Sequence, residues 1–127
     1  MDKIKYEIEF TINVSPQSLY EYISTPSGLS KWFADNVNSR GDTYSFIWDG
    51  SEEEAELITK KKDTFIKLKW EEDEQKDSFF ELRIQVDELT KDVSLIVTDF
   101  AEEDEVEESK LLWENQIGEL KQLLGAA

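Results

Sequence analysis

The sequence predicts an α+β fold in which a curved antiparallel sheet of about six or seven strands wraps around a long carboxy-terminal helix, with two short helices after the first strand. Three patterns predict it. Polar and apolar residues alternate from residue 4 to residue 14, alternating runs separated by turn residues occupy residues 37–100, and the apolar spacing becomes helical after residue 105. The chain of 127 residues is expected to form one domain spanning residues 1–127.

The first strand and the two helices after it follow from local signals. Six apolar residues take alternate positions in the strand: Ile4, Tyr6, Ile8, Phe10, Ile12 and Val14. Ser15-Pro16 and Thr25-Pro26 each place a hydroxyl side chain before a proline, an arrangement that favours the start of a helix. One face of each predicted helix is apolar, with Leu19 and Ile23 in the first, and Leu29, Trp32 and Phe33 in the second.

Residues 37–100 predict a series of short strands joined by tight turns. The dipeptide Asp49-Gly50 is the strongest hairpin signal, and Gly41-Asp42, Lys62-Asp63 and Lys91-Asp92 mark further turns. Because the connections are short, consecutive strands are expected to be antiparallel neighbours. The residues predicted to face inward in the successive strands are Tyr44, Phe46 and Trp48; Ala55, Leu57 and Thr59; Ile66, Leu68 and Trp70; Phe80, Leu82, Ile84 and Val86; and Val93, Leu95 and Val97.

The last segment predicts a helix of about twenty residues, from Glu105 to Leu124. Gly118 within it is expected to allow close packing on the sheet. Because no other element is long enough to cover the apolar face of the sheet, we expect this helix to lie against the first strand. Its apolar stripe consists of Val106, Trp113, Ile117, Leu120 and Leu124, widened by Leu112 and Leu123. The residues expected to be buried together are Ile4, Ile8, Phe10 and Ile12 from the strand, and Trp113, Ile117 and Leu120 from the helix.

The composition excludes several classes of function. The chain has no cysteine and no histidine, which excludes disulfides, thiolate metal sites, thiol nucleophiles and imidazole catalysis; we expect no metal and no cofactor. With 14 basic and 30 acidic residues, the net charge is −16, which repels nucleic acid. No apolar run reaches the ~20 residues of a membrane helix, and residues 1–10 lack a signal-peptide core. We therefore expect a cytoplasmic protein without a membrane partner.

Several short motifs occur in a specific order along the chain. Ser15-Pro16 precedes Leu19-Tyr20, Thr25-Pro26, Leu29 and Trp32-Phe33; Gly41 precedes Tyr44 and Phe46; Trp70 lies in mid-sheet; and Trp113 begins a helical row with Ile117, Leu120 and Leu124. With this order of elements, the chain resembles the helix-grip fold of the START-like (SRPBCC) superfamily. It is most similar to the Aha-type heat-shock ATPase activator homology family. Two features depart from that family: Leu112-Trp113 stands where Gly-Trp is frequent, and residues 102–108 are almost wholly acidic.

The resemblance implies a hydrophobic cavity between the sheet and the last helix, where helix-grip proteins bind apolar ligands. The residues expected to line it are Trp32, Phe33, Trp48, Trp70, Asp99, Trp113 and Ile117. Aromatic rows at strand and helix spacing are also typical of an ordinary core, so a filled interior is the alternative. Asp99 is included because alternation along the strand from Val93 turns it inward, where burial raises a carboxyl pKa. The alternative is that the strand ends before Asp99 and that its carboxylate is solvated.

Three functions remain open at this stage. The first is a non-catalytic START-like module that binds a small apolar ligand. The second is an acidic protein-interaction or chaperone-associated regulatory domain with a filled core, whose protein partner contacts the acidic clusters at residues 52–56, 71–74 and 102–108. The third is a cyclase or aromatase-type enzyme, although no nucleophile–base pair is recognisable. The acidic clusters lack the spacing of a calcium loop, so we expect them to be solvated surface.

Overall fold

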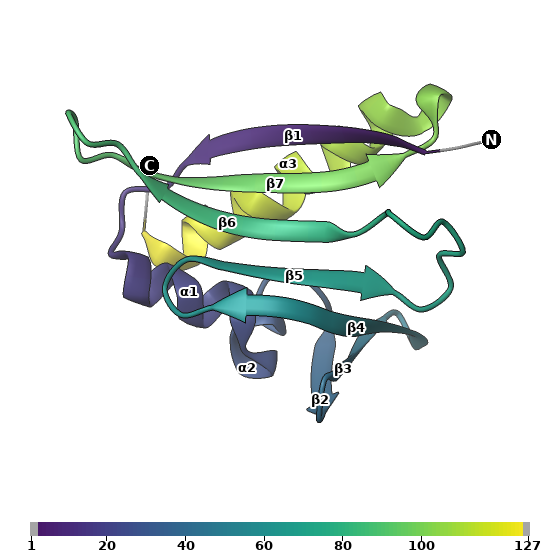
Figure 1. Ribbon diagram of the computed structural model, residues 1–127. Helices are drawn as coiled ribbons and strands as arrows, with labels where there is room; N and C mark the ends of the chain where they lie inside the picture. The colour runs from purple at the N-terminus through teal and green to yellow at the C-terminus, as the bar shows by residue number, and fades with distance from the viewer. Residues whose placement is uncertain (1–2, 126–127) are drawn as a thin grey trace.

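A computed structural model describes residues 3–125 as a seven-stranded antiparallel sheet covered on one face by a long helix (Figure 1). The strand order is β1-β7-β6-β5-β4-β3-β2, so β1 and β2 form the two edges. This arrangement confirms the predicted helix-grip fold. The elements in chain order are β1 (Ile4–Thr11), α1 (Pro16–Ser24), α2 (Pro26–Leu29), β2 (Asn36–Arg40), β3 (Thr43–Trp48), β4 (Ser51–Lys61), β5 (Phe65–Trp70), β6 (Phe80–Val86), β7 (Val93–Ala101), the 3₁₀ turn η1 (Glu103–Glu105) and α3 (Val106–Leu124).

β1 pairs with β7 along its whole length, and the pairing brings the amino-terminal strand beside the strand that leads into α3. Tyr6 and Ile12 are buried on the helix-covered face, while Ile8 and Phe10 are half-buried. Ile4 is 44% exposed, so the prediction that it is buried is wrong. It pairs with Ala101 at the outer end of the edge strand, past the point at which α3 reaches Tyr6 through Ser109. The alternation of polar and apolar residues continues to Ile4, but no other element covers its side chain.

Both predicted helix starts have the expected caps. The Ser15 hydroxyl accepts a hydrogen bond from the Ser18 backbone N–H (3.1 Å), and the Thr25 hydroxyl accepts one from the Gly28 N–H (2.9 Å). The second helix is shorter than predicted and ends at Leu29, so Trp32 and Phe33 lie in the turns after it. After these turns, the backbone N–H of residue 35 donates to the Ile47 carbonyl (2.9 Å), next to the start of the β2–β3 pairing.

The strand turns occur where the turn dipeptides predict them. Asp49 and Gly50 have φ values of 52° and 84°, as a two-residue hairpin with left-handed central residues requires. In β4 the register shifts after Leu57, and Thr59 pairs with the outward-facing Lys67. This β-bulge makes the predicted inward orientation of Thr59 wrong, because the extra residue reverses the alternation. Val86, also predicted to face inward, is 44% exposed at the end of β6.

α3 begins and ends within one residue of its prediction, and Gly125 ends it in the left-handed conformation (φ 68°). Trp113, Ile117 and Leu120 are buried against the sheet. Three other expectations for this helix are wrong. Leu112 and Leu123 are 61% and 48% exposed, and a Cβ built on Gly118 meets no atom within 4 Å, so this glycine makes no close contact. The sheet therefore covers a narrower stripe of α3 than the apolar residues of the helix would form.

The solvent-facing side of β4 carries a row of carboxylates. Glu52, Glu54 and Glu56 alternate along the solvent-facing side of β4 and are exposed. The two ion pairs found among residues 3–125 are Lys3–Asp73 and Arg83–Glu81, both at 3.1 Å. No helix among the residues described combines the length and the hydropathy needed to cross a membrane.

This charge distribution predicts that salt stabilises the protein. Charges of one sign repel one another more strongly in the folded state, and the screening length falls from about 30 Å at 0.01 M to about 8 Å at 0.15 M salt. We expect the melting temperature to rise over that range of sodium chloride, as measured by circular dichroism. The matched control is the triple variant Glu52→Gln, Glu54→Gln, Glu56→Gln, for which the rise should be smaller. A flat or falling melting temperature in the unaltered protein would contradict this prediction.

Candidate functional site

Aromatic rings form a continuous cluster under the amino-terminal half of α3. Phe33, which follows α2, lies at its centre. The centroid of its ring is 5.2 Å from that of Phe46, 5.5 Å from those of Trp48 and Trp113, and 6.1 Å from that of Phe80. Three separate parts of the chain therefore meet here: the segment after α2, the strands of the sheet, and α3.

Part of this cluster is open to a pocket of about 420 Å³ between α3 and the sheet. Its aromatic walls are Phe33, Trp48, Trp70 and Trp113. Two carboxylates also line it, Glu53 from β4 and Asp99 from β7. The helix contributes Leu112 and three polar side chains, which are Ser109, Asn115 and Gln116.

Five of the seven residues proposed from the sequence line this pocket, namely Phe33, Trp48, Trp70, Asp99 and Trp113. The other two lie elsewhere. Trp32 lines a neighbouring pocket of about 380 Å³, and its indole N–H donates to the Tyr22 carbonyl (2.7 Å). Ile117 is completely buried in the core, one helical turn past Trp113.

Sequence reasoning missed five pocket residues: Leu112, Asn115, Glu53, Ser109 and Gln116. Signals existed for the last three. Glu53 alternates with the buried Ala55, so the same rule that turned Ala55 inward applies to it. Ser109 and Gln116 lie four residues before and three residues after Trp113, on the same side of the helix. All three are polar, and a search for apolar positions passed over them.

Asp99 is the ionisable group held most firmly in the pocket. Its Oδ2 accepts a hydrogen bond from the Trp113 indole N–H (2.8 Å), and its Oδ1 accepts one from the Phe100 backbone N–H (2.7 Å). Burial raises the pKa of Asp99 above 3.8, and these hydrogen bonds offset only part of the rise. Beside it, the Tyr6 hydroxyl is hydrogen-bonded to Ser109, and burial raises the pKa of Tyr6 to about 12.

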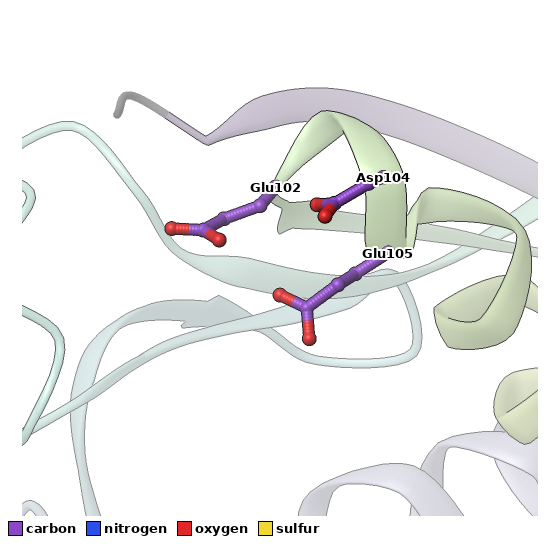
Figure 2. Close-up of side chains that lie close together, drawn as sticks. All are labelled: Glu102, Asp104 and Glu105. Carbon is purple, nitrogen blue, oxygen red and sulfur yellow. The ribbon is translucent and has the colours of Figure 1, made fainter.

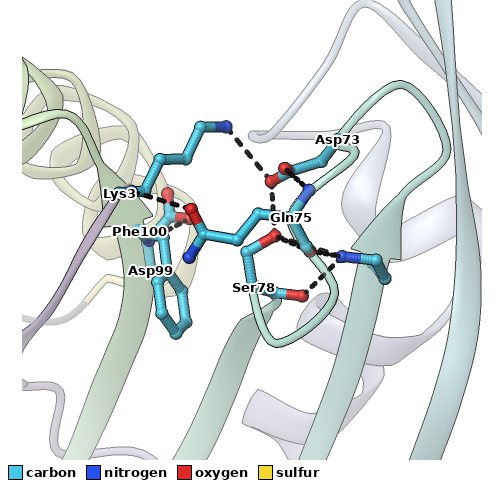
Figure 3. Close-up of polar contacts among 7 residues, drawn as sticks. Lys3, Asp73, Gln75, Ser78, Asp99 and Phe100 are labelled. Atoms are coloured by element: carbon cyan, nitrogen blue, oxygen red, sulfur yellow. Dashed lines mark hydrogen bonds and ion pairs between the residues drawn. The ribbon is translucent and has the colours of Figure 1, made fainter. Parts of the chain in front are cut away.

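The loop between β5 and β6 is hydrogen-bonded to Lys3, which lies just before β1 and close to Asp99 (Figure 3). The backbone N–H of Lys3 donates to the Gln75 side-chain oxygen (2.7 Å), and its ammonium group pairs with Asp73 (3.1 Å). The Ser78 hydroxyl donates to the same Asp73 carboxylate (2.6 Å). Lys3 is thus engaged by the loop, although it lies near enough to Asp99 to lower the pKa of that carboxyl slightly against the effect of burial.

The raised pKa of Asp99 predicts a specific pH dependence. In the folded state Asp99 binds a proton more readily than in the unfolded chain, so its favourable contribution is fully present below pH 3.8 and is lost as the pH rises through the raised pKa. Asp99→Asn removes this effect. The variant should therefore gain stability relative to the unaltered protein as the pH rises from about 3 to about 7.

The measurement is urea unfolding of both proteins across that range. Taking the difference between them cancels the opposite contributions of Asp73 and Asp87, whose pKa values are lowered in the folded state. A difference that stays constant with pH would contradict the assignment of a raised pKa to Asp99.

A second group of carboxylates lies where β7 leads into α3 (Figure 2). Glu102, Asp104 and Glu105 each offer an oxygen within 4.8 Å of the others, but Asp104 and Glu105 are exposed. The acidic residues of this turn lie at the amino-terminal end of α3, where negative charge interacts favourably with the helix dipole. This role accounts for the cluster, and we assign it no metal.

Comparisons with known proteins agree with this architecture. A family model described as a START-like superfamily domain matches residues 1–126. No curated protein matches the chain. Among solved structures, BfR322 from Bacteroides fragilis is 34% identical, with a TM-score of 0.67, over 98% of this chain and 93% of that one. The Aha1 dimer from Colwellia psychrerythraea is 16% identical, with a TM-score of 0.78, over 93% of each chain. CalU16 from Micromonospora echinospora is 14% identical, with a TM-score of 0.73, over 96% of this chain and 74% of that one.

Proposed function

This chain belongs to the START-like superfamily, and on that premise we propose that it binds a small, largely apolar molecule in the pocket between α3 and the sheet. The observation that carries the proposal is the set of four aromatic walls, Phe33, Trp48, Trp70 and Trp113, around a pocket of about 420 Å³. Pockets of roughly 300–1,000 Å³ with apolar walls and a few polar groups are typical of small-molecule sites.

The size of the pocket limits the affinity. A ligand that buries ~300 Å² of apolar surface gains about 7 kcal/mol at roughly 25 cal/mol per Å². The loss of translational and rotational freedom on binding offsets much of this gain. We therefore expect dissociation constants that are micromolar at best.

We propose binding without catalysis, because Asp99 and Ser109, two polar side chains of the site, are held in hydrogen bonds that support its walls. The Asp99 carboxylate accepts from the Trp113 indole and from a backbone N–H. The Ser109 hydroxyl is hydrogen-bonded to Tyr6. These contacts join α3 to β1 and β7, and they support the walls of a binding pocket.

The test is a titration with the neutral probe 1-naphthalenemethanol, followed through the indole N–H signals of the tryptophans by NMR. We expect saturable shifts for the tryptophans of the pocket. Leu112 lines the pocket and is 61% exposed, so Leu112→Arg should weaken binding about tenfold without disturbing the core. Leu123→Arg, at a position on the same helix that is 48% exposed and lies outside this pocket, is the matched control. Absence of binding below a millimolar dissociation constant would refute the proposal.

A second candidate is a docking domain for a basic protein, and the crowding of carboxylates beside β4 favours it. Glu71 lies against Glu56 and Glu54, and a hydrogen bond with Glu56 is the main cause that raises the pKa of Glu71. Like charges held this close favour a cationic partner. Binding of a lysine-rich decapeptide at 0.15 M salt, abolished by Glu54→Gln with Glu56→Gln, would support this function, and binding unaffected by those changes would refute it.

A further inference from the structure

Resting on the proposed function, we propose that the ligand of this pocket carries a cationic nitrogen, a protonated amine or a quaternary ammonium group, joined to an apolar body. The ionisable residues that line the pocket, among those the structure describes, are the carboxylates of Glu53 and Asp99, and no lysine or arginine belongs to the lining. An anionic ligand would therefore meet only like charge on the walls of the pocket. The net charge of −16 adds a field of the same sign.

The Asp99 carboxylate is oriented but not neutralised. Its two oxygens accept hydrogen bonds from the Trp113 indole N–H at 2.8 Å and from the Phe100 N–H at 2.7 Å, and the neighbouring Tyr6 hydroxyl also favours the ionised form. A carboxylate has about four lone-pair sites, so each oxygen retains capacity for a further donor. Within the part of the chain described, Asp99 forms no ion pair, and the nearby Lys3 pairs with Asp73 instead. The site lacks a positive partner for a buried charge, and a ligand ammonium group supplies one.

The aromatic walls suit the same class of ligand. The ring centroids of Phe33 and Trp113 are 5.5 Å apart, and those of Trp48 and Trp70 are 6.0 Å apart, so the rings form one continuous wall. Phe33 and Trp113 are buried, and the half-buried Trp48 and Trp70 present most of the ring surface open to a ligand. Indole and phenyl faces attract cations, most strongly where water is excluded. The same rings bind an apolar body through buried area. A neutral ligand would gain only the burial of apolar surface and no attraction between a cation and the rings.

The two carboxylates are far enough apart to define an orientation. β7 and β4 are separated by three strand intervals in the sheet order. At about 4.8 Å per interval this corresponds to roughly 14 Å along the sheet between the two strands. Asp99 is half-buried beside Trp113, whereas Glu53 is exposed. We therefore place the nitrogen at Asp99 and the apolar body towards Trp48 and Trp70.

The test compares three probes that share one ring system: 1-naphthylmethylamine, 1-naphthalenemethanol and 1-naphthoate. Binding is measured by calorimetry and by NMR at pH 7 in 0.15 M sodium chloride. We expect the amine, which is protonated at this pH, to bind at least tenfold more tightly than the alcohol, and the naphthoate to bind more weakly than either. The Trp113 indole N–H, which is bonded to Asp99, should shift most with the amine.

Asp99→Asn, nearly identical in shape, should bring the ratio of amine to alcohol affinity close to one. Glu54→Gln removes a carboxylate from the opposite side of β4 and is the matched control for general surface charge; it should leave the ratio unchanged. If Asp99→Asn does not fold, as judged by its circular dichroism and indole signals, Asp99→Ser takes its place.

The outcomes separate the two proposals. Equal affinity for amine and alcohol in the unaltered protein would overturn the inference of a cationic ligand and leave the proposed binding function standing. Binding of none of the probes would overturn both. A preference for the amine that Glu54→Gln reduces as much as Asp99→Asn, or that only Glu53→Gln removes, would overturn the assignment to Asp99.

Discussion

Replacing Gly28 with alanine is expected to lower the free energy of unfolding by about 3 kcal/mol or more, at the upper end of what overpacking costs. A Cβ at this position would lie 2.1 Å from the Glu21 carbonyl oxygen and 2.6 Å from the Tyr22 Cα. Both are backbone atoms of α1, so they have no rotamer by which to move away. The Thr25 hydroxyl tightens the same corner, since it donates to the Glu21 carbonyl (2.7 Å) and accepts from the Gly28 N–H (2.9 Å).

Gly118→Ala is the matched control for this prediction, because it makes the same chemical change in open space. A Cβ there meets nothing within 4 Å, and alanine favours a helix over glycine by up to about 1 kcal/mol. Urea unfolding should therefore show a large loss for Gly28→Ala and a small gain for Gly118→Ala. A loss below about 1 kcal/mol at Gly28 would mean that α1 and α2 separate easily, contrary to the packing described.

Truncation of Ile117 to alanine is expected to cost about 2–5 kcal/mol. The side chain is completely buried in the middle of α3, where it joins the helix to the core of the sheet. The loss consists of the buried apolar surface of the removed atoms and of the cavity that remains, since a helix held at Trp113 and Leu120 on either side collapses only partly. Chemical denaturation with an unchanged dependence on denaturant concentration would measure it.

Ile8→Ala provides the comparison from the opposing strand. Ile8 is half-buried on the edge strand β1, so its truncation should cost roughly half as much as that of Ile117, about 1–2 kcal/mol. Two equal losses would show that β1 is covered more completely than the structure indicates. A loss below about 0.5 kcal/mol at Ile117 would contradict the position of α3 on the sheet.

Local chemistry made several elements predictable from the sequence. The caps at Ser15 and Thr25 depend on a hydroxyl and a proline that are adjacent in the chain. The hairpin at Asp49-Gly50 depends on residues that tolerate positive φ. The core face of α3 follows from the spacing of Trp113, Ile117 and Leu120. In each case the physical cause lies within a few residues of its effect.

The incorrect predictions concern residues whose burial depends on distant parts of the chain. Nothing local to Ile4 indicates that α3 begins too late to cover it, and nothing local to Thr59 indicates that β4 is bulged against β5. Gly118 was expected to touch the sheet, but that side of the helix is exposed to solvent. Periodicity states which residues share a face, whereas the packing of distant elements decides how much of that face is covered.

The candidate site shows the same division. Alternation from Val93 was enough to predict that Asp99 faces inward. The aromatic residues at strand and helix spacing were enough to predict most of the pocket walls. The sequence thus determined the chemistry available to the site: aromatic rings, carboxylates, and neither histidine nor cysteine. Only the tertiary structure decided which of these groups meet. It separates Trp32 and Ile117 from the pocket, adds Glu53, and joins Asp99 to Trp113, because contacts between β3, β4, β7 and α3 depend on strand order and helix placement, which no local pattern encodes.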